Sequence, residues 1–286
     1  KYINDWTAKK TNHTIKDLLD AGENTAQSVL VIVNAIYFTG YRWSVPFDVK
    51  RTIIAPFFVS ESRKILTRMM TLKYKPFRYG ECFRLKDAKV IEFAYAGDKV
   101  SMYVFLPTIN EGGMSLFLQR FRTFRLDDCI TKMHNVDIDV VLPKFRLTEK
   151  TKLKGVLTSM GMQNLFDDTA ADLSGIDGRR NLVVSDVFHQ AYVDVNEGST
   201  GATSDITNEQ DASDSLVVPF RADHPFVFLI RDKTTGIILF MGVFNSPEEE
   251  GLVEVKDSDD AYTDDNNCGV DNVRKAGQLS LWMGGL

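Results

Sequence analysis

The residue types that most often carry chemistry are few in this chain and widely separated. Its four histidines, His13, His134, His189 and His224, show no spacing that would place two of them on one metal ion. Its three cysteines cannot all pair, and no two of them lie at CxxC spacing, so we expect neither a disulfide framework nor a zinc site. Cys129 follows two aspartates, whose negative charge disfavours the reactive thiolate.

The short motifs of common enzyme classes are also missing from the sequence. It contains no GxSxG, GxxxxGK[ST], HExxH or GxGxxG pattern. The acidic stretch Asp205–Asp214 does not match the spacing of a calcium-binding hand. We therefore expect no catalytic residues, no metal and no cofactor.

Composition and charge narrow the choice of partners. The chain has 286 residues, of which 44% are hydrophobic and 26% charged, with a net charge of -5. Residues 248–286 hold 10 acids against 3 bases, which leaves 29 acids and 31 bases in a nearly neutral body. Such a body predicts neither a nucleic-acid partner nor a membrane partner, and the longest apolar run, Val29–Phe38, is too short to span a bilayer. Because the chain begins at Lys1 and not at Met, we interpret it as a piece of something longer.

The elements that must position any functional residue can be read from the hydrophobic pattern. Ser28–Phe38 is apolar on both alternating faces, which predicts a central strand covered on both sides. Asn34 would then be a buried amide that needs a hydrogen-bond partner. Val90–Ala96 and Val100–Leu106 predict a hairpin that turns at Gly97-Asp98.

The second half of the chain predicts further strands around one long polar stretch. Glu197–Asp214 is almost free of large apolar side chains, and a connection of this length is typical of a functional or disordered loop. We expect strands at Val136–Val140, ending by Pro143, and at Val184–Val195, a helix over Leu153–Met160 closed by Gly161, and a hairpin of Phe226–Ile230 with Ile237–Val243.

Several segments resemble one family. Phe220–Ile230 (FRADHPFVFLI) is very similar to the signature of the serpin family of protease inhibitors. In the same order as in serpins, the chain also contains Asn34–Phe38 (NAIYF) followed by Trp43, then Ala171–Gly175 (ADLSG), and Ser185–His189 (SDVFH). The resemblance covers residues 1–247 and leaves the acidic segment 248–286 outside the family.

The resemblance implies an α+β fold with mixed and antiparallel sheets A, B and C surrounded by helices. Residues 1–247 would be a partial serpin domain that starts at helix F and lacks helices A to E. Residues 248–286 would be a tail, which we expect to be disordered because it is acidic and poor in apolar residues.

The resemblance to serpins also implies a function that needs no catalytic residues. A target protease cleaves an exposed reactive-centre loop, and the cut loop inserts as a new strand into sheet A while the protease remains attached as an acyl-enzyme. By position, the polar stretch is this loop. Asn34 and His189 match the family's shutter pair, which would supply the partner for the buried amide, and Trp43 matches its breach tryptophan.

The loop residues follow from a gap-free alignment with the family. The hinge would be Glu197, Gly198, Ser199 and Thr200, and the inward-facing loop positions would include Thr200, Ala202 and Ser204. The alanine run usual in inhibitors is replaced by Thr203–Ile206 (TSDI), which could slow insertion. We expect the scissile bond among the residues Asp211, Ala212, Ser213 and Asp214.

The loop composition indicates the class of target. No Arg or Lys lies between Gly198 and Pro219, so a trypsin-like enzyme would find no basic side chain to bind. We expect an elastase-like serine protease or an aspartate-cutting enzyme, which could be a cysteine protease. The alternatives are a non-inhibitory serpin of the carrier, storage or chaperone type, and an inactive partial gene product.

The remaining expectations concern modification, location and assembly. Asn12-His13-Thr14 is an N-glycosylation sequon. From the family we expect an extracellular, secreted protein, with a cytoplasmic location as the alternative. We expect a monomer, and we interpret the basic residues from Lys144 to Lys154 as a solvated face and not as a glycosaminoglycan site.

Overall fold

The computed structural model describes residues 1–20, 29–85, 88–108, 113–198, 217–247 and 254–255. The chain divides into two compact units, the first formed by Lys1–Thr39 with Arg146–Asp194 and the second by Gly40–Phe145 with Val195–Leu286. The described helices are short, and none is long and apolar enough to cross a membrane. The α-helices are α1 (Tyr2–Lys10), α2 (Gly113–Phe121), α3 (Asp127–Ile130), α4 (Lys154–Ser159) and α5 (Ser174–Asp177), and the 3-10 turns are η2 (Val49–Arg51), η3 (Phe83–Leu85) and η4 (Asn164–Phe166). The strands are β1 (Leu30–Phe38), β2 (Ile53–Phe58), β3 (Lys64–Cys82), β4 (Ala88–Ala94), β5 (Val100–Leu106), β6 (His134–Pro143), β7 (Phe145–Lys152), β8 (Val184–Val195), β9 (Val218–Arg221), β10 (Phe226–Asp232), β11 (Ile238–Phe244) and β12 (Glu254–Val255).

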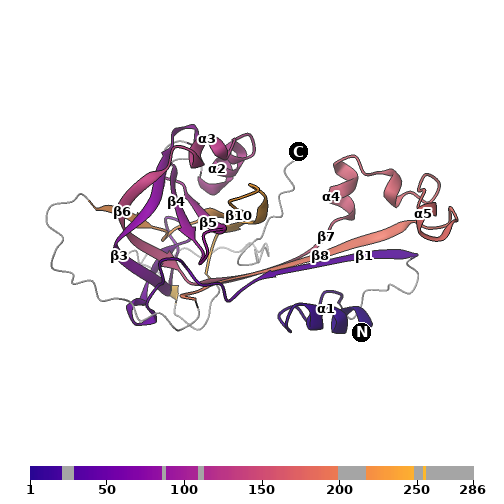
Figure 1. The fold of residues 1–286 in the computed structure, drawn as a ribbon, viewed down its shortest axis with the longest axis horizontal. Coiled ribbons are helices and arrows are strands. Elements are labelled where there is room, and N and C mark those ends of the chain that lie inside the picture. Colours follow the sequence, from indigo (N-terminus) through magenta and orange to yellow (C-terminus); the bar gives the residue numbers. More distant parts are fainter. Residues whose placement is uncertain (21–28, 86–87, 109–112, 199–216, 248–253, 256–286) are drawn as a thin grey trace, which may run out of the picture. The chain divides into compact units, whose positions relative to one another are not determined.

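The first unit is built on a three-stranded sheet in the order β1-β8-β7. β1 runs parallel to β8, with Leu30 opposite Val184 and Phe38 opposite Val193. Figure 1 shows α1 and α4 on opposite sides of this sheet. The apolar side of α4 packs on β8 in a small core that includes Leu157 and Val187. The strand predicted at Val184–Val195 and the helix closed by Gly161, which has a φ of 103°, are confirmed.

The prediction that Ser28–Phe38 is a central strand covered on both faces is wrong for the described structure. β1 lies at the end of its sheet and pairs, within the described ranges, with β8 alone. Ile32 is 41% exposed and Tyr37 38% exposed, and Asn34 is exposed as well. The apolar pattern does predict a strand, but the burial of that strand depends on what packs against it, which the pattern does not contain.

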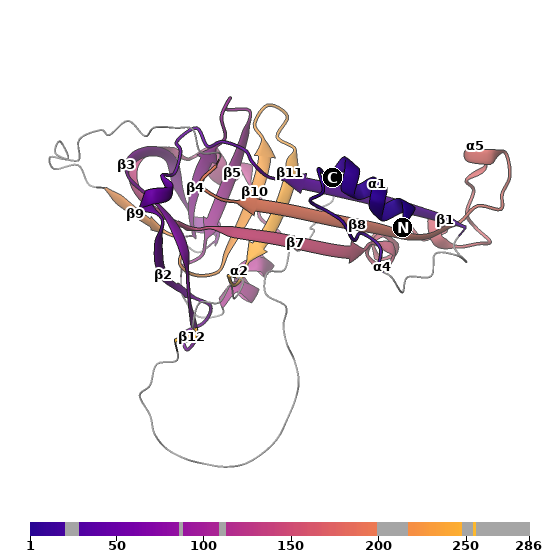
Figure 2. The ribbon, with the colours of Figure 1, turned by 90° about the horizontal axis from the view of Figure 1, so that it is seen from below.

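The second unit contains a nine-stranded sheet whose main path is β11-β10-β5-β4-β3-β6-β9. β3 is 19 residues long and also pairs with β2 and β12 (Figure 2). Glu254 and Val255 of β12 lie opposite Ile65 and Lys64 of β3, and the rest of the predicted tail lies outside the described residues.

Both predicted hairpins are confirmed in this sheet. β4 pairs with β5 in antiparallel register, and the turn between them has Gly97 at φ 90° and Asp98 at φ 52°. Glycine and aspartate tolerate this left-handed backbone better than most residues, so the pair sets the turn. β10 pairs with β11 in the same manner, and β6 ends at Pro143 as its sequence predicts.

Apolar side chains from distant strands form the core of the second unit. Phe244 lies at the centre of one group, with ring centroids 4.7 Å from Phe145, 5.2 Å from Phe57 and 5.2 Å from Phe226. A second cluster lies beneath α2 and α3 and includes Phe105, Phe117, Ile130, Met133, Val227, Leu229 and Val243.

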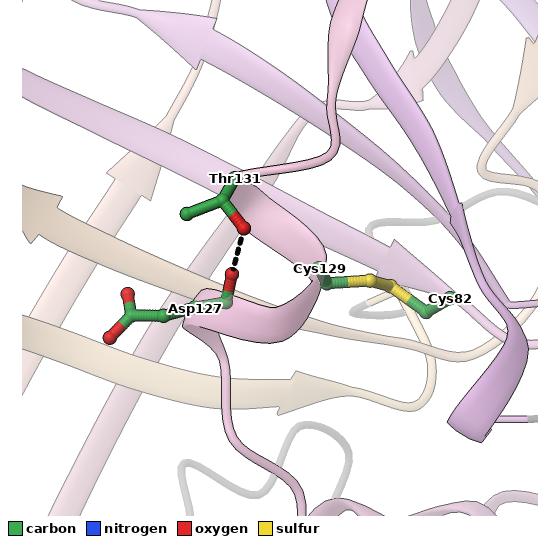
Figure 3. The surroundings of a disulfide bond; sticks show 4 residues. All are labelled: Cys82, Asp127, Cys129 and Thr131. Atoms are coloured by element: carbon green, nitrogen blue, oxygen red, sulfur yellow. Dashed lines mark hydrogen bonds between the residues drawn. A yellow bond between two sulfur atoms is a disulfide. The ribbon is translucent and has the colours of Figure 1, made fainter.

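One disulfide is present that the sequence did not predict, although it does not make a disulfide framework. Cys82 at the end of β3 is bonded to Cys129 of α3 (Figure 3). The two cysteines are 47 residues apart, and only the path of the chain through β4, β5 and α2 brings them together. No local spacing could therefore have predicted this pair.

Candidate functional site

The predicted functional residues fall in two groups, and part of them cannot be located. Ser199, Thr200, Ala202, Ser204 and the predicted scissile segment 211–214 lie outside the described residues. Asn34 and His189 belong to the first unit, whereas Trp43, Glu197 and Gly198 belong to the second. In neither unit do the described residues include a group of three or more His, Cys, Asp or Glu side chains that could hold a metal ion.

Glu197 forms a buried ion pair in the second unit. The residue is 7% exposed, and its carboxylate accepts hydrogen bonds from Lys144 Nζ at 2.9 Å and from Thr52 Oγ1 at 2.8 Å. Burial raises the pKa of Glu197, but the hydrogen bonds from Lys144 and Thr52 and the charge of Lys144 outweigh it and hold the pKa below its usual value. Glu197 is therefore anchored as a carboxylate to the strand-end residue Lys144.

Trp43 fixes the next part of the same segment. Its indole Nε1 donates a 2.7 Å hydrogen bond to the backbone oxygen of Asn196, and its ring stacks on Tyr95 with centroids 4.4 Å apart. Asn196 Oδ1 accepts from the backbone N–H of Gly198 at 2.8 Å. Gly198 has a φ of 87°, and a Cβ atom there would come 3.4 Å from the oxygen of Tyr41.

These contacts hold three consecutive residues at the start of the predicted loop. Asn196 is held through its carbonyl, Glu197 through its carboxylate and Gly198 through its N–H. The chain that leaves β8 is thus held by hydrogen bonds as far as Gly198. Sequence analysis identified Trp43 and Glu197 but missed Lys144 and Thr52 as the partners of Glu197, because these residues are 53 and 145 positions away from it.

A charged network that the sequence analysis missed lies beside Trp43. Glu92 is 4% exposed, and its carboxylate contacts Arg78 Nη1 at 2.8 Å, Ser101 Oγ at 2.7 Å and Lys233 Nζ at 3.1 Å. A cavity of about 220 Å³ lies between this network and the rings of Trp43, Phe77 and Phe93. The sequence does contain one indication of this network, a single glutamate within the apolar run Val90–Ala96. A carboxylate that is buried there requires cationic partners.

The shutter pair is brought together in the first unit, but not as the sequence predicts. Asn34 of β1 lies directly opposite His189 of β8 in the parallel register. His189 is 5% exposed, and burial lowers its pKa, so the ring is neutral at physiological pH. Neither ring nitrogen has a hydrogen-bond partner among the described residues. The expected hydrogen bond between His189 and Asn34 is therefore not formed, and Asn34 is exposed instead of buried.

The comparison with protein families identifies the chain. A family model described as serpin (serine protease inhibitor) matches residues 1–247. The chain belongs to the serpin family.

Individual relatives agree with this assignment. The serpin is 36% identical over 254 residues to Serpin B8 of Bos taurus, covering 86% of this chain and 66% of that protein. It is 37% identical over 256 residues to leukocyte elastase inhibitor of Homo sapiens, covering 86% of this chain and 66% of that protein. The first relatives are matched over 58% to 66% of their own length.

Solved serpin structures match a similar share of this chain. Uncleaved ovalbumin superimposes with a TM-score of 0.72 at 30% identity, over 86% of this chain and 62% of that one. Serpin48 of the insect Tenebrio molitor superimposes with a TM-score of 0.71 at 32% identity, over 86% and 64% of the two chains. The predicted α+β serpin fold is thereby confirmed.

Proposed function

We propose that this serpin inhibits a protease by the trapping mechanism, in which a cleaved reactive-centre loop inserts into the sheet of the first unit. The observation that carries this proposal is the pairing of β1 with β8. These two strands are parallel neighbours, and the chain that leaves β8 continues directly into the predicted loop. A loop that folds back at this point can add a strand between them, which is a known way for a sheet to bind an extended segment.

The anchored segment before the loop supports the same proposal. The hydrogen bonds of Asn196, Glu197 and Gly198 fix the place where the loop begins, so cleavage farther along the loop frees only its far end. Side chains that enter a sheet interior must be small or apolar, and the expected inward residues Thr200, Ala202 and Ser204 meet that requirement.

For the target we propose an elastase-like serine protease that cleaves after Ala212 or Ser213. The lack of Arg and Lys from Gly198 to Pro219 supports this choice, and so does the relative named leukocyte elastase inhibitor. An aspartate-cutting enzyme that cleaves after Asp211 is the second candidate.

The test is to incubate the intact protein with an elastase-type, a trypsin-type and an aspartate-specific protease. We expect a covalent complex with one of the two non-tryptic enzymes that survives denaturing electrophoresis. Mass spectrometry of the released peptide should place the cut between Asp211 and Asp214. Cleavage without any complex would contradict inhibition and favour a non-inhibitory serpin or an inactive partial product, and rapid stoichiometric trapping of trypsin would contradict the proposed specificity.

A matched pair of loop variants tests the insertion step. In the expected register, Thr200 enters the sheet and Ser199 faces solvent, so a charged side chain is costly only at Thr200. We expect Thr200→Arg to abolish the complex while leaving cleavage intact, and Ser199→Arg to retain the complex. Equal behaviour of the two variants would exclude this register.

For location and assembly we propose a secreted monomer whose partner is the target protease. Asn12 is exposed in the turn after α1, with a φ of 48°, so the sequon would be accessible to glycosylation in a secreted protein. Glycan release from the mature protein, seen as a mass loss that Asn12→Gln abolishes, is the measurement. An unmodified Asn12 in protein from its natural source would favour the cytoplasmic alternative.

A further inference from the structure

The disulfide lies in the interior of the second unit. Cys82 is 2% exposed and Cys129 is 4% exposed, and both belong to the apolar cluster beneath α2 and α3. Their Cα atoms are 5.6 Å apart, within the usual range for a disulfide. A bond in this position is shielded from dissolved thiols as long as the unit stays folded.

The helix that carries Cys129 cannot be stable by itself. α3 has four residues, and no side chain caps its first turn. Directly after α3, the Thr131 hydroxyl donates a 2.6 Å hydrogen bond to the backbone oxygen of Asp127, as Figure 3 shows. A single helical turn fixes more backbone freedom than one or two hydrogen bonds repay, so α3 depends on attachment to its neighbours.

α3 has further attachments to its neighbours. Ile130 is buried in the same apolar cluster, and its backbone oxygen accepts a 2.9 Å hydrogen bond from Arg78 Nη2 of β3. Two partly exposed ion pairs also contact α3. Arg84 Nη1 lies 3.2 Å from Asp128 Oδ2, and both side chains are substantially exposed. Arg231 Nη1 lies 2.9 Å from Asp127 Oδ1, a carboxylate that is 71% exposed. Exposed ion pairs contribute little to stability because water and salt screen them. The disulfide adds a covalent link between α3 and β3 to these noncovalent contacts.

The bond also encloses a large part of the sheet. The two cysteines are separated by 47 positions, and the segment between them contains β4, β5 and α2, while β6 begins four residues after α3 ends. Closing a loop of this length removes conformational freedom from the unfolded chain and so stabilises the folded state. β6 in turn pairs with β3 and β9, so loss of the bond would also destabilise the pairing of these strands.

We propose that Cys82–Cys129 is a redox-dependent staple that gives this serpin two stability states, one for oxidising and one for reducing surroundings. Formation removes two protons and two electrons from the two thiols, and a low-molecular-weight disulfide such as oxidised glutathione accepts them and leaves as two thiols. Because the pair is buried, exchange occurs before folding is complete or when the unit opens. The third cysteine, Cys268, lies outside the described residues and takes no part in the bond.

The first experiment determines the bond directly. The protein is folded in a glutathione redox buffer, free thiols are blocked with iodoacetamide, and the chain is digested without reductant. We expect a linked peptide pair that contains Cys82 and Cys129, and a single alkylated cysteine at position 268. Alkylation of both core cysteines, or a bond from either of them to Cys268, would overturn the proposal.

The second experiment measures the effect on stability in the same protein. We expect a strong reductant to lower the unfolding temperature of the wild type and of the control Cys268→Ser by roughly 5–15 °C. The double variant C82S/C129S should unfold at the temperature of the reduced wild type and should not respond to reductant. An unchanged unfolding temperature of the wild type after full reduction would overturn the proposal, and this readout does not require the variant to fold.

Discussion

The ion pair between Lys144 and Glu197 offers the sharpest test of how the start of the loop is held. In the variant Lys144→Met, the 6% exposed carboxylate of Glu197 keeps the hydrogen bond from Thr52 but loses its cation. Methionine retains the length of the lysine stem, so packing changes little. The variant therefore isolates the cost of leaving a buried carboxylate partly unpaired.

The expected cost is moderate because one partner is partly exposed to water. Removing one member of a deeply buried pair costs about 3–5 kcal/mol. The Lys144 side chain is 37% exposed, so solvent already screens part of the attraction. We therefore expect a loss of about 2 kcal/mol in the free energy of unfolding at pH 7.5, the usual cost of a buried acceptor that loses a charged donor.

The pH dependence has a defined sign. In the wild type the pKa of Glu197 is lowered, so its contribution is present above the pKa of the unfolded chain and is lost as pH falls through the folded pKa. In Lys144→Met burial is no longer offset by the cation, so the pKa rises and the variant binds a proton at higher pH. The difference between the two proteins should be largest at pH 7.5 and should shrink toward pH 4.

Urea unfolding followed by tryptophan fluorescence measures this difference. Lys73→Met is the matched control, because Lys73 is an exposed lysine on β3 of the same unit. The double variant K144M/E197Q should recover part of the lost stability, since glutamine still accepts from Thr52 without carrying a charge. A Lys144→Met variant as stable as Lys73→Met at pH 7.5, or a difference that grows as pH falls, would refute the reasoning.

Three further substitutions probe the same region. Trp43→Phe should lose about 1 kcal/mol of unfolding free energy, measured by urea titration with circular dichroism, because the backbone oxygen of Asn196 loses its donor. Gly198→Ala should lose about 1–2 kcal/mol of unfolding free energy in the same assay, because the φ of 87° at this position disfavours any residue with a Cβ atom. No loss would mean that the backbone at this position relaxes freely. Arg78→Met should lose about 1–3 kcal/mol because it leaves the Glu92 carboxylate short of one donor, and adding Glu92→Gln should restore part of that loss in thermal unfolding.

Features determined by neighbouring residues could be predicted from the sequence. The turn between β4 and β5 needs Gly97 and Asp98, and the end of β6 needs Pro143, so both follow from local backbone chemistry. The family signature at Phe220–Ile230 is local too, and it led to the fold.

Features that depend on distant partners could not be predicted. The carboxylate of Glu197 is bonded to Thr52, which is 145 positions away, and two strands and a helix separate Cys82 from Cys129 in the chain. The prediction that β1 is buried on both faces was wrong for the same reason, because an apolar strand is buried only if other elements cover it. Residue type gives the tendency of a side chain to be buried, while its partner is set by topology.

The parallel arrangement of β1 and β8 has an energetic consequence. They share one ladder along the nine residues of β1, and parallel ladders have slanted hydrogen bonds that are slightly weaker per residue. A segment that leaves the end of β8 and turns back must run opposite to β8, and therefore opposite to β1 as well. Its entry would exchange one parallel ladder for two antiparallel ladders. In the proposed insertion the sheet would gain this strand, and an extended peptide of suitable sequence supplied from outside should compete for the same place.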